Sequence, residues 1–157
     1  MRIEALREEL RQPGARTGVG VWLMPMAYLG REEAIAARLD VQAMDARQAY
    51  LDYLETRSAG ASFSGLTQVD GYQKLVAWLH SLAHGQYHRD CLLVHTLDLL
   101  LLALEASERD QFWRDALQGL PYPPTKLILA VPEKGTDLFP FPLRRRYPAL
   151  IAEGPYD

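Results

Sequence analysis

The sequence of 157 residues has little cysteine, no long uninterrupted apolar run and no excess of basic residues. Its single cysteine, Cys91, cannot form a disulfide within the chain, which is typical of proteins from a reducing compartment. The longest apolar stretch, 92–104, contains His95 and Asp98 and is shorter than a bilayer-spanning helix requires. Residues 1–11 lack the apolar core of a secretory signal peptide. These absences predict a cytoplasmic protein that does not enter a membrane.

The charge balance likewise limits the classes of partner. A formal net charge of −3 and a pI near 5.8 leave no overall basic character of the kind that nucleic-acid-binding domains show. Any contact with DNA is therefore expected to be indirect or to come from a local basic cluster. With 48% hydrophobic and 24% charged residues, the composition is that of an ordinary globular protein, and the length suits one domain.

The order of apolar patterns predicts a single α/β domain over residues 1–157. Apolar runs typical of strands alternate with segments of helical periodicity, which favours a mainly parallel five-stranded sheet flanked by helices. The expected strands are 17–24, 41–44, 91–96, 126–131 and an edge strand at 149–152. The expected helices are 2–12, 31–39, 46–57, 71–84 and 107–118. The small-residue stretch 58–66 predicts a surface loop.

The first expected strand is followed by a loop with the layout of a phosphate-binding P-loop, G-x-x-x-x-G-K-[ST]. On that pattern Pro25 takes the place of the first glycine, and Glu32 that of the serine or threonine. Proline has no N–H for a phosphate, and a glutamate offers Mg²⁺ no hydroxyl and adds negative charge. Gly30 and Arg31, in place of the second glycine and the lysine, are the remaining candidates for nucleotide binding. The alternative is an ordinary strand–turn–helix.

The third expected strand has the layout of the second P-loop motif, in which an apolar strand ends in an acid that holds Mg²⁺. Here His95 stands at the strand end and Asp98 follows three residues later. Imidazole is a poor ligand for Mg²⁺, which prefers oxygen. Together the two motifs predict a P-loop-NTPase-like fold with degenerate Walker A and B sequences, no catalytic residues and no cofactor. Alternatively, His95 and Asp98 only hydrogen-bond to each other or to backbone.

Three histidines, His80, His84 and His88, precede Cys91 at spacings that could suit zinc. However, Gly85 interrupts the helix, and the H-E-x-x-H pattern of zinc hydrolases is missing. We therefore expect a solvent-facing helix end, where cations suit the helix dipole, and no metal site.

The C-terminal segment 138–157 is rich in proline, arginine and aromatic residues. Arginine and aromatic side chains are enriched at protein interfaces, and arginines also bind phosphate. The sequence therefore predicts an exposed partner-binding segment on a loop, unless these arginines are simply solvated. Its candidate residues are Phe139, Phe141, Arg144, Arg145, Arg146 and Tyr147.

Over about residues 17–135 the order of elements resembles that of small P-loop-like subunits of bacteriophage-exclusion (BREX) defence systems. The resemblance includes the segments Leu-Leu-Val-His-Thr-Leu-Asp-Leu-Leu-Leu and Thr-Lys-Leu-Ile-Leu-Ala-Val-Pro. Members of that group that bind nucleotide carry both motifs. Others lack them and act as adaptors to larger enzymes, among them an alkaline-phosphatase-like subunit.

Because this sequence departs from the motifs at Pro25, Glu32 and His95, the resemblance implies a non-catalytic adaptor or scaffold. Its partner would be a larger protein of a bacterial anti-phage defence or DNA-processing complex, with DNA contacted only indirectly or through Arg144–Arg146. Two alternatives remain. One is a nucleotide-binding ATPase subunit completed by a partner. The other is a regulatory interaction domain unrelated to P-loop folds.

Overall fold

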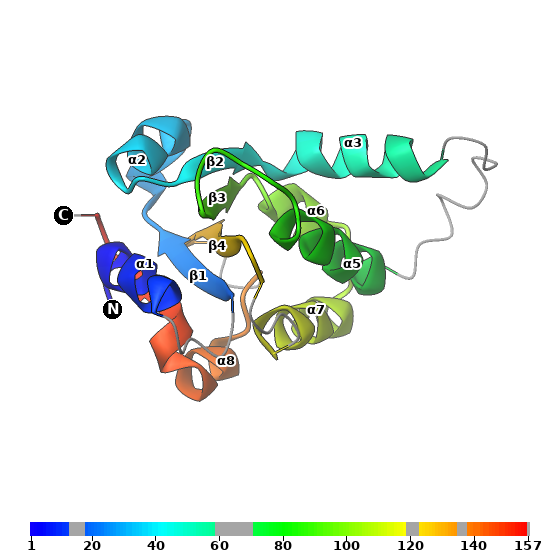
Figure 1. The fold of residues 1–157 in the computed structure, drawn as a ribbon. Helices are drawn as coiled ribbons and strands as arrows, with labels where there is room; N and C mark the ends of the chain where they lie inside the picture. The colour runs from blue at the N-terminus through cyan, green and yellow to red at the C-terminus, as the bar shows by residue number, and fades with distance from the viewer. Residues whose placement is uncertain (13–17, 59–70, 119–122, 135–137, 157) are drawn as a thin grey trace.

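The computed structural model describes residues 1–12, 18–58, 71–118, 123–134 and 138–156 (Figure 1). Its centre is a five-stranded sheet in the order β2-β3-β4-β1-β5, and every strand pair is parallel. The strands are β1 (Val19–Met24), β2 (Gln42–Asp45), β3 (Cys91–His95), β4 (Lys126–Pro132) and β5 (Ile151–Glu153). The α/β class and the five-stranded sheet are confirmed, and the sheet is wholly rather than mainly parallel.

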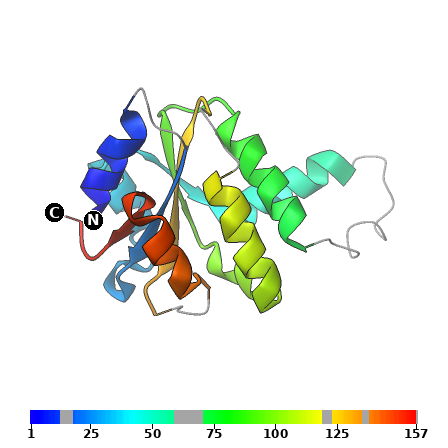
Figure 2. The same ribbon diagram turned by 90° about the horizontal axis from the view of Figure 1, so that it is seen from below.

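The central strands are apolar on both faces because helices cover both sides of the sheet, as a parallel sheet requires. All six residues of β1 are buried, with alternate side chains in two separate cores. Helices α1 (Ile3–Arg11) and α2 (Glu32–Arg38) pack on one face (Figure 2). The helices whose apolar residues pack on the opposite face are α3 (Ala46–Ser58), α5 (Gly71–Ala83), α6 (Asp98–Leu102), α7 (Ala106–Gln118) and α8 (Phe141–Arg146).

Most predicted elements agree with the structure to within a few residues, and Asp45 caps α3 by accepting the Arg47 N–H at 2.9 Å. Helices α6 and α8 and the short 3-10 helices η1 (Met26–Tyr28) and η2 (Pro148–Leu150) were not predicted. Apart from Ser58, the last residue of α3, the predicted loop 58–66 lies outside the described residues. In the described part of the chain, no helix combines the length and apolarity needed to cross a membrane.

Two connections leave the middle of the sheet in opposite directions. From β1 the chain passes through α2 to the edge strand β2, whereas from β4 it passes through α8 to the other edge strand, β5. The neighbouring strands β1 and β4 therefore form a topological switch point. In open α/β sheets, ligands bind outside the carboxyl ends of the strands at such a point. The topology therefore favours a ligand site between the loop after β1 and the residues after β4.

Candidate functional site

The carboxyl edge of the sheet brings together the two segments whose patterns predicted P-loop motifs. The loop 25–31 follows β1, and His95 ends β3, with β4 between these two strands. Asp45, at the end of β2, is paired in register with His95. Glu133 directly follows β4, and its N–H donates to the Met24 carbonyl at 2.8 Å. This edge therefore gathers two acidic residues, Asp45 and Glu133, together with His95 and the loop after β1, around the position where a nucleotide would be expected.

The backbone of the loop after β1 is folded into tight turns rather than an open cradle. Donor N–H groups in the loop bond to carbonyls three residues earlier: Tyr28 to Pro25 at 3.0 Å, Leu29 to Met26 at 3.2 Å and Arg31 to Tyr28 at 2.9 Å. A phosphate cradle needs several successive N–H groups that point at the ligand. These N–H groups are instead used within the protein.

Two further N–H groups of the loop donate to carboxylates. The Gly30 N–H donates to Glu32 Oε1 at 3.1 Å, and the Met26 N–H donates to Glu133 Oε1 at 3.4 Å. Glu32 is buried, with 9% of its surface exposed. Gly30 has φ of +83°, a conformation that suits glycine. Negative charge therefore already occupies the loop where a phosphate would bring more.

Arg31, the counterpart of the P-loop lysine, lies just before α2. Its guanidinium stacks on the Tyr28 ring, 5.8 Å from the ring centroid. The structure thus places Gly30 and Arg31 in the predicted loop, while the Gly30 N–H is engaged by Glu32. Nucleotide binding by these two residues stays a prediction.

At the end of β3, His95 Nδ1 lies 2.8 Å from the Thr96 hydroxyl oxygen. Thr96 has φ of +63°, which is unfavourable for a β-branched residue and is found mostly where the surrounding structure holds it. Asp98 is the first residue of α6. The hydrogen-bond partner of the His95 ring is therefore its own neighbour, and the strained turn redirects the chain from β3 into α6.

The histidine-rich segment does not converge on its cysteine. His84 is exposed, with its Nδ1 2.8 Å from the His80 carbonyl, and the two rings stack at 6.4 Å. Cys91 is fully buried in β3, and burial raises the pKa of its thiol to about 12. Within the described ranges, no group of three or more His, Cys, Asp or Glu residues could hold a metal ion.

The predicted partner-binding residues lie in and around a helix, not on a loop. Phe139 is only 1% exposed, and its ring meets that of Trp113 edge-to-face at 4.9 Å, so the expectation that it is exposed is wrong. Phe141 is 60% exposed, with the guanidiniums of Arg144 and Arg145 at 5.7 and 5.5 Å from its ring centroid. The surface of α8 that remains available comprises Phe141, Arg144, Arg145, Arg146 and Tyr147, which we call the α8 surface.

A hollow of about 620 Å³ adjoins the α8 surface at the carboxyl ends of β1, β4 and β5. Arg144 lines it and pairs with Glu153, with 3.3 Å between Nη1 and Oε1. Lys134 and Glu133 also line this hollow. Neither this hollow nor the contact between Glu133 and the loop after β1 could be predicted from the sequence, because both depend on the strand order.

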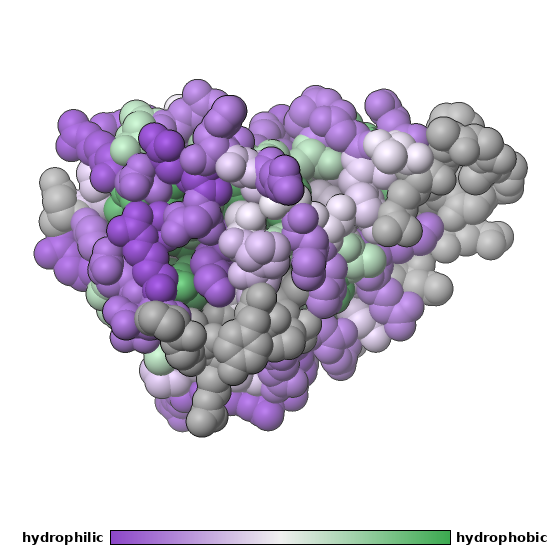
Figure 3. All heavy atoms as spheres, viewed as in Figure 1, coloured by the Kyte–Doolittle hydropathy of each residue, from purple (hydrophilic) through white to green (hydrophobic). Residues whose placement is uncertain are grey.

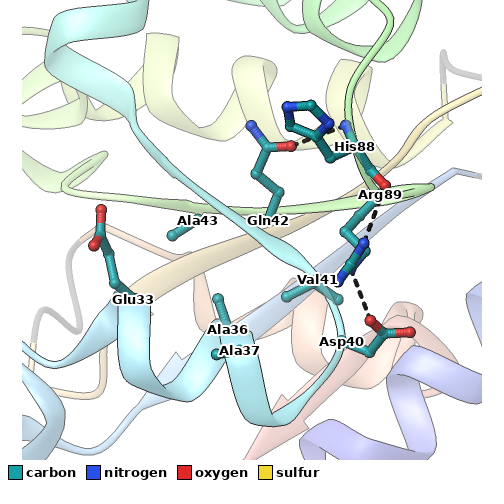
Figure 4. A pocket seen from close by; sticks show the side chains of 9 residues that line it. All are labelled: Glu33, Ala36, Ala37, Asp40, Val41, Gln42, Ala43, His88 and Arg89. Carbon is teal, nitrogen blue, oxygen red and sulfur yellow. Dashed lines mark hydrogen bonds and ion pairs between the residues drawn. The ribbon is translucent and has the colours of Figure 1, made fainter.

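A second hollow, of about 700 Å³, lies between α2 and the edge strand β2 (Figure 4). Its floor carries small residues such as Ala36 and Ala37, and at one end Arg89 pairs with Asp40 at 2.8 Å. On the face seen in Figure 3 most of the surface is hydrophilic, with apolar residues in small scattered areas. The described residues that line this second hollow include no serine, threonine or cysteine.

The site thus has two distinctive features. One is the loop after β1 with its two carboxylates, and the other is the arginine-rich helix α8. Comparison with protein-family models, with curated proteins and with solved structures found no match.

Proposed function

We propose that this chain is a non-catalytic adaptor that binds and positions a larger partner protein. The observation that carries the proposal is the occupation of the loop after β1 by the carboxylates of Glu32 and Glu133. An oxygen-rich phosphate at this point would lie against two negative charges, and it would find most of the loop N–H groups already bonded. Binding without catalysis is the function that fits such a loop.

The α8 surface is the proposed docking surface for the partner. Arginine and aromatic residues contribute a large share of the energy at interfaces. Here the ring of Phe141 holds two guanidiniums, and that of Tyr147 holds Arg146 at 5.6 Å. Side chains already held in place lose less freedom on binding. The positive charge of three successive arginines favours an acidic surface on the partner.

The resemblance to the small BREX subunits suggests the setting in which this adaptor would work. We propose a bacterial anti-phage defence or DNA-processing complex, with a larger enzyme subunit as the partner. DNA would be contacted through that partner or through Arg144–Arg146.

A second candidate is a nucleotide-binding ATPase subunit completed by a partner. It is favoured by the position of the loop after β1 at a topological switch point, on the same sheet edge as His95. In this case Arg31 would replace the P-loop lysine, and the partner would supply the other phosphate and Mg²⁺ contacts.

Thermal unfolding with ATP and Mg²⁺ separates the two candidates. Ligand at a hundredfold excess over Kd should stabilise a nucleotide-binding protein by about 2.7 kcal/mol, which for a chain of this size raises Tm by about 5–11 °C. The adaptor proposal predicts no shift and no phosphate release. A shift that disappears in Arg31→Ala would contradict it.

Affinity purification from the native host tests the docking surface. We expect a larger protein to be retained by the wild type and lost in Arg145→Glu/Arg146→Glu. The matched control is Arg47→Glu, which changes an exposed arginine on α3. Equal retention by all three proteins would refute the α8 surface as the docking site.

A further inference from the structure

A second arginine–aromatic surface lies on the face of the sheet that α1 and α2 cover, opposite the face on which α8 packs. The rings of Tyr28 and Tyr156 are 5.3 Å apart. The guanidinium of Arg31 stacks over Tyr28 at 5.8 Å, and that of Arg38 over Tyr156 at 5.7 Å. We call these four residues, which come from the loop after β1, α2 and the C-terminal end, the tyrosine–arginine surface.

The tyrosine–arginine surface is built on the protein core. Both tyrosines pack against the core between the sheet and helices α1 and α2, and the centroid of the Tyr28 ring is 5.9 Å from that of Trp22. Trp22 is fully buried, and its indole N–H donates to the Gly154 carbonyl at 3.0 Å. This bond fixes the chain just before Tyr156. The two rings are therefore held in place before any partner binds, which lowers the entropy lost on association.

In the part of the chain that the structure describes, the two guanidiniums of this surface, like those of several other arginines, have no carboxylate partner. Arg7, Arg11, Arg89, Arg114 and Arg144 each form an ion pair with an aspartate or glutamate. Among the described residues, no such pair involves Arg31 or Arg38, and both are exposed. The nearby carboxylates of Glu32 and Glu133 accept from backbone N–H groups and not from these guanidiniums, whose donors are thus available for carboxylates supplied from outside.

The neighbouring exposed residues indicate which acidic ligand fits. Leu29 is 46% exposed and Met26 38% exposed, both on the tight turn that carries Tyr28. Large exposed apolar side chains next to aromatic and arginine residues are typical of protein interfaces. A phosphate backbone would leave them uncovered, whereas a protein segment can supply apolar side chains as well as carboxylates. These features favour an acidic protein segment over a nucleic acid.

We propose that the tyrosine–arginine surface binds an acidic segment of a partner protein. Carboxylates of that segment pair with Arg31 and Arg38, and an apolar side chain packs on Leu29 and the tyrosine rings. Arg31 and Arg38 are seven positions apart, at the N-cap and the last residue of α2, so their backbones are about 10 Å apart along the helix axis, and the segment carries two acidic groups, one for each guanidinium. The proposal does not rest on the α8 surface, and it gives the protein a second docking face.

Selection from a displayed library of random 12-residue peptides tests the proposal on the full chain. We expect enriched peptides to carry at least two acidic residues and an apolar residue. Their Kd should rise at least about tenfold in Arg31→Gln/Arg38→Gln, because each change removes a charged hydrogen-bond donor. The control Arg47→Gln should bind as the wild type does, as should Arg145→Gln/Arg146→Gln, which alters only the α8 surface. Thermal unfolding checks that all variants are folded.

Several results would overturn the proposal. These are the absence of enriched peptides, enrichment without acidic residues, or unchanged affinity in a folded Arg31→Gln/Arg38→Gln variant. Loss of peptide binding in Arg145→Gln/Arg146→Gln would also contradict it, because the site would then be the α8 surface. Finally, an oligothymidylate that binds more tightly than the selected peptide at the same salt concentration would assign the surface to nucleic acid. Failure of the α8 variants to release a partner in the purification above would leave this proposal unaffected.

Discussion

Replacing Phe139 with alanine should destabilise the protein severely, whereas the same change at Phe141, two residues later, should leave its stability almost unaltered. Phe139 is 1% exposed, and its ring lies edge-to-face against Trp113 at an interplanar angle of 85°. The Trp113 indole N–H also donates to the carbonyl of Leu138, and this hydrogen bond holds the backbone that precedes α8. Phe141, the first residue of α8, is 60% exposed.

The magnitudes follow from burial. Loss of a buried phenylalanine side chain costs about 3–5 kcal/mol, since the transfer free energy is lost and a cavity remains. In a chain of this size each kcal/mol lowers Tm by about 2–4 °C, so Phe139→Ala should unfold about 6–20 °C below the wild type. A surface change away from special features stays within about 0.5 kcal/mol, which limits the shift for Phe141→Ala to about 2 °C.

Thermal and urea unfolding followed by far-ultraviolet circular dichroism measure both variants, and affinity purification measures partner retention. We expect Phe141→Ala to keep its Tm and to retain less partner. A wild-type Tm for Phe139→Ala would show that its ring does not belong to the core. Early unfolding of Phe141→Ala would mean that α8 contributes this ring to the core, and the α8 surface could not then be a docking site.

Three further predictions concern single polar groups. Glu32→Ala should destabilise the protein by about 0.5–1.5 kcal/mol in urea unfolding, since the exposed Gly30 N–H exchanges its carboxylate acceptor for water, whereas Glu32→Gln keeps an acceptor and should cost less. Burial raises the pKa of the Cys91 thiol to about 12. At pH 8 this thiol should therefore react with a disulfide reagent at least about a hundredfold more slowly in the native protein than in the urea-unfolded protein. Equal reaction rates would refute its burial. Burial alone would raise the pKa of Asp90, but the hydrogen bond and charge of Arg7 lower it below its ordinary value of 3.8. The ion pair of Asp90 with Arg7 therefore contributes its full stability at pH values above 3.8, and this contribution is lost as the pH falls through the lower pKa of Asp90 in the native protein. In urea unfolding, Asp90→Asn should therefore lose less stability than the wild type as the pH is lowered through this range.

Local patterns in the sequence were sufficient for the class of fold. Runs such as β1 and β4 are apolar at nearly every position, and only a strand covered on both faces needs that pattern. Asp45 was recognisable as a helix cap because capping involves residues two or three positions apart. Helix α6 was missed because its leucines continue the apolar run of β3, and the backbone turn at Thr96 has no sequence signal. Helix α8 was missed because its prolines suggested a loop, although proline is compatible with a first helical turn.

The candidate sites, in contrast, were decided by tertiary structure. Glu133 meets the loop after β1 because β4 lies beside β1, and nothing in either segment specifies that order. Phe139 is buried because α7 presents Trp113 to it, and Tyr156 completes the tyrosine–arginine surface because β5 pairs with β1. The sequence alone determined which residues are apolar, charged or conformationally restricted, since these are properties of single side chains. Whether such a residue becomes core, acceptor or exposed surface depends on which distant segment packs against it, and only the three-dimensional arrangement of strands and helices fixes that.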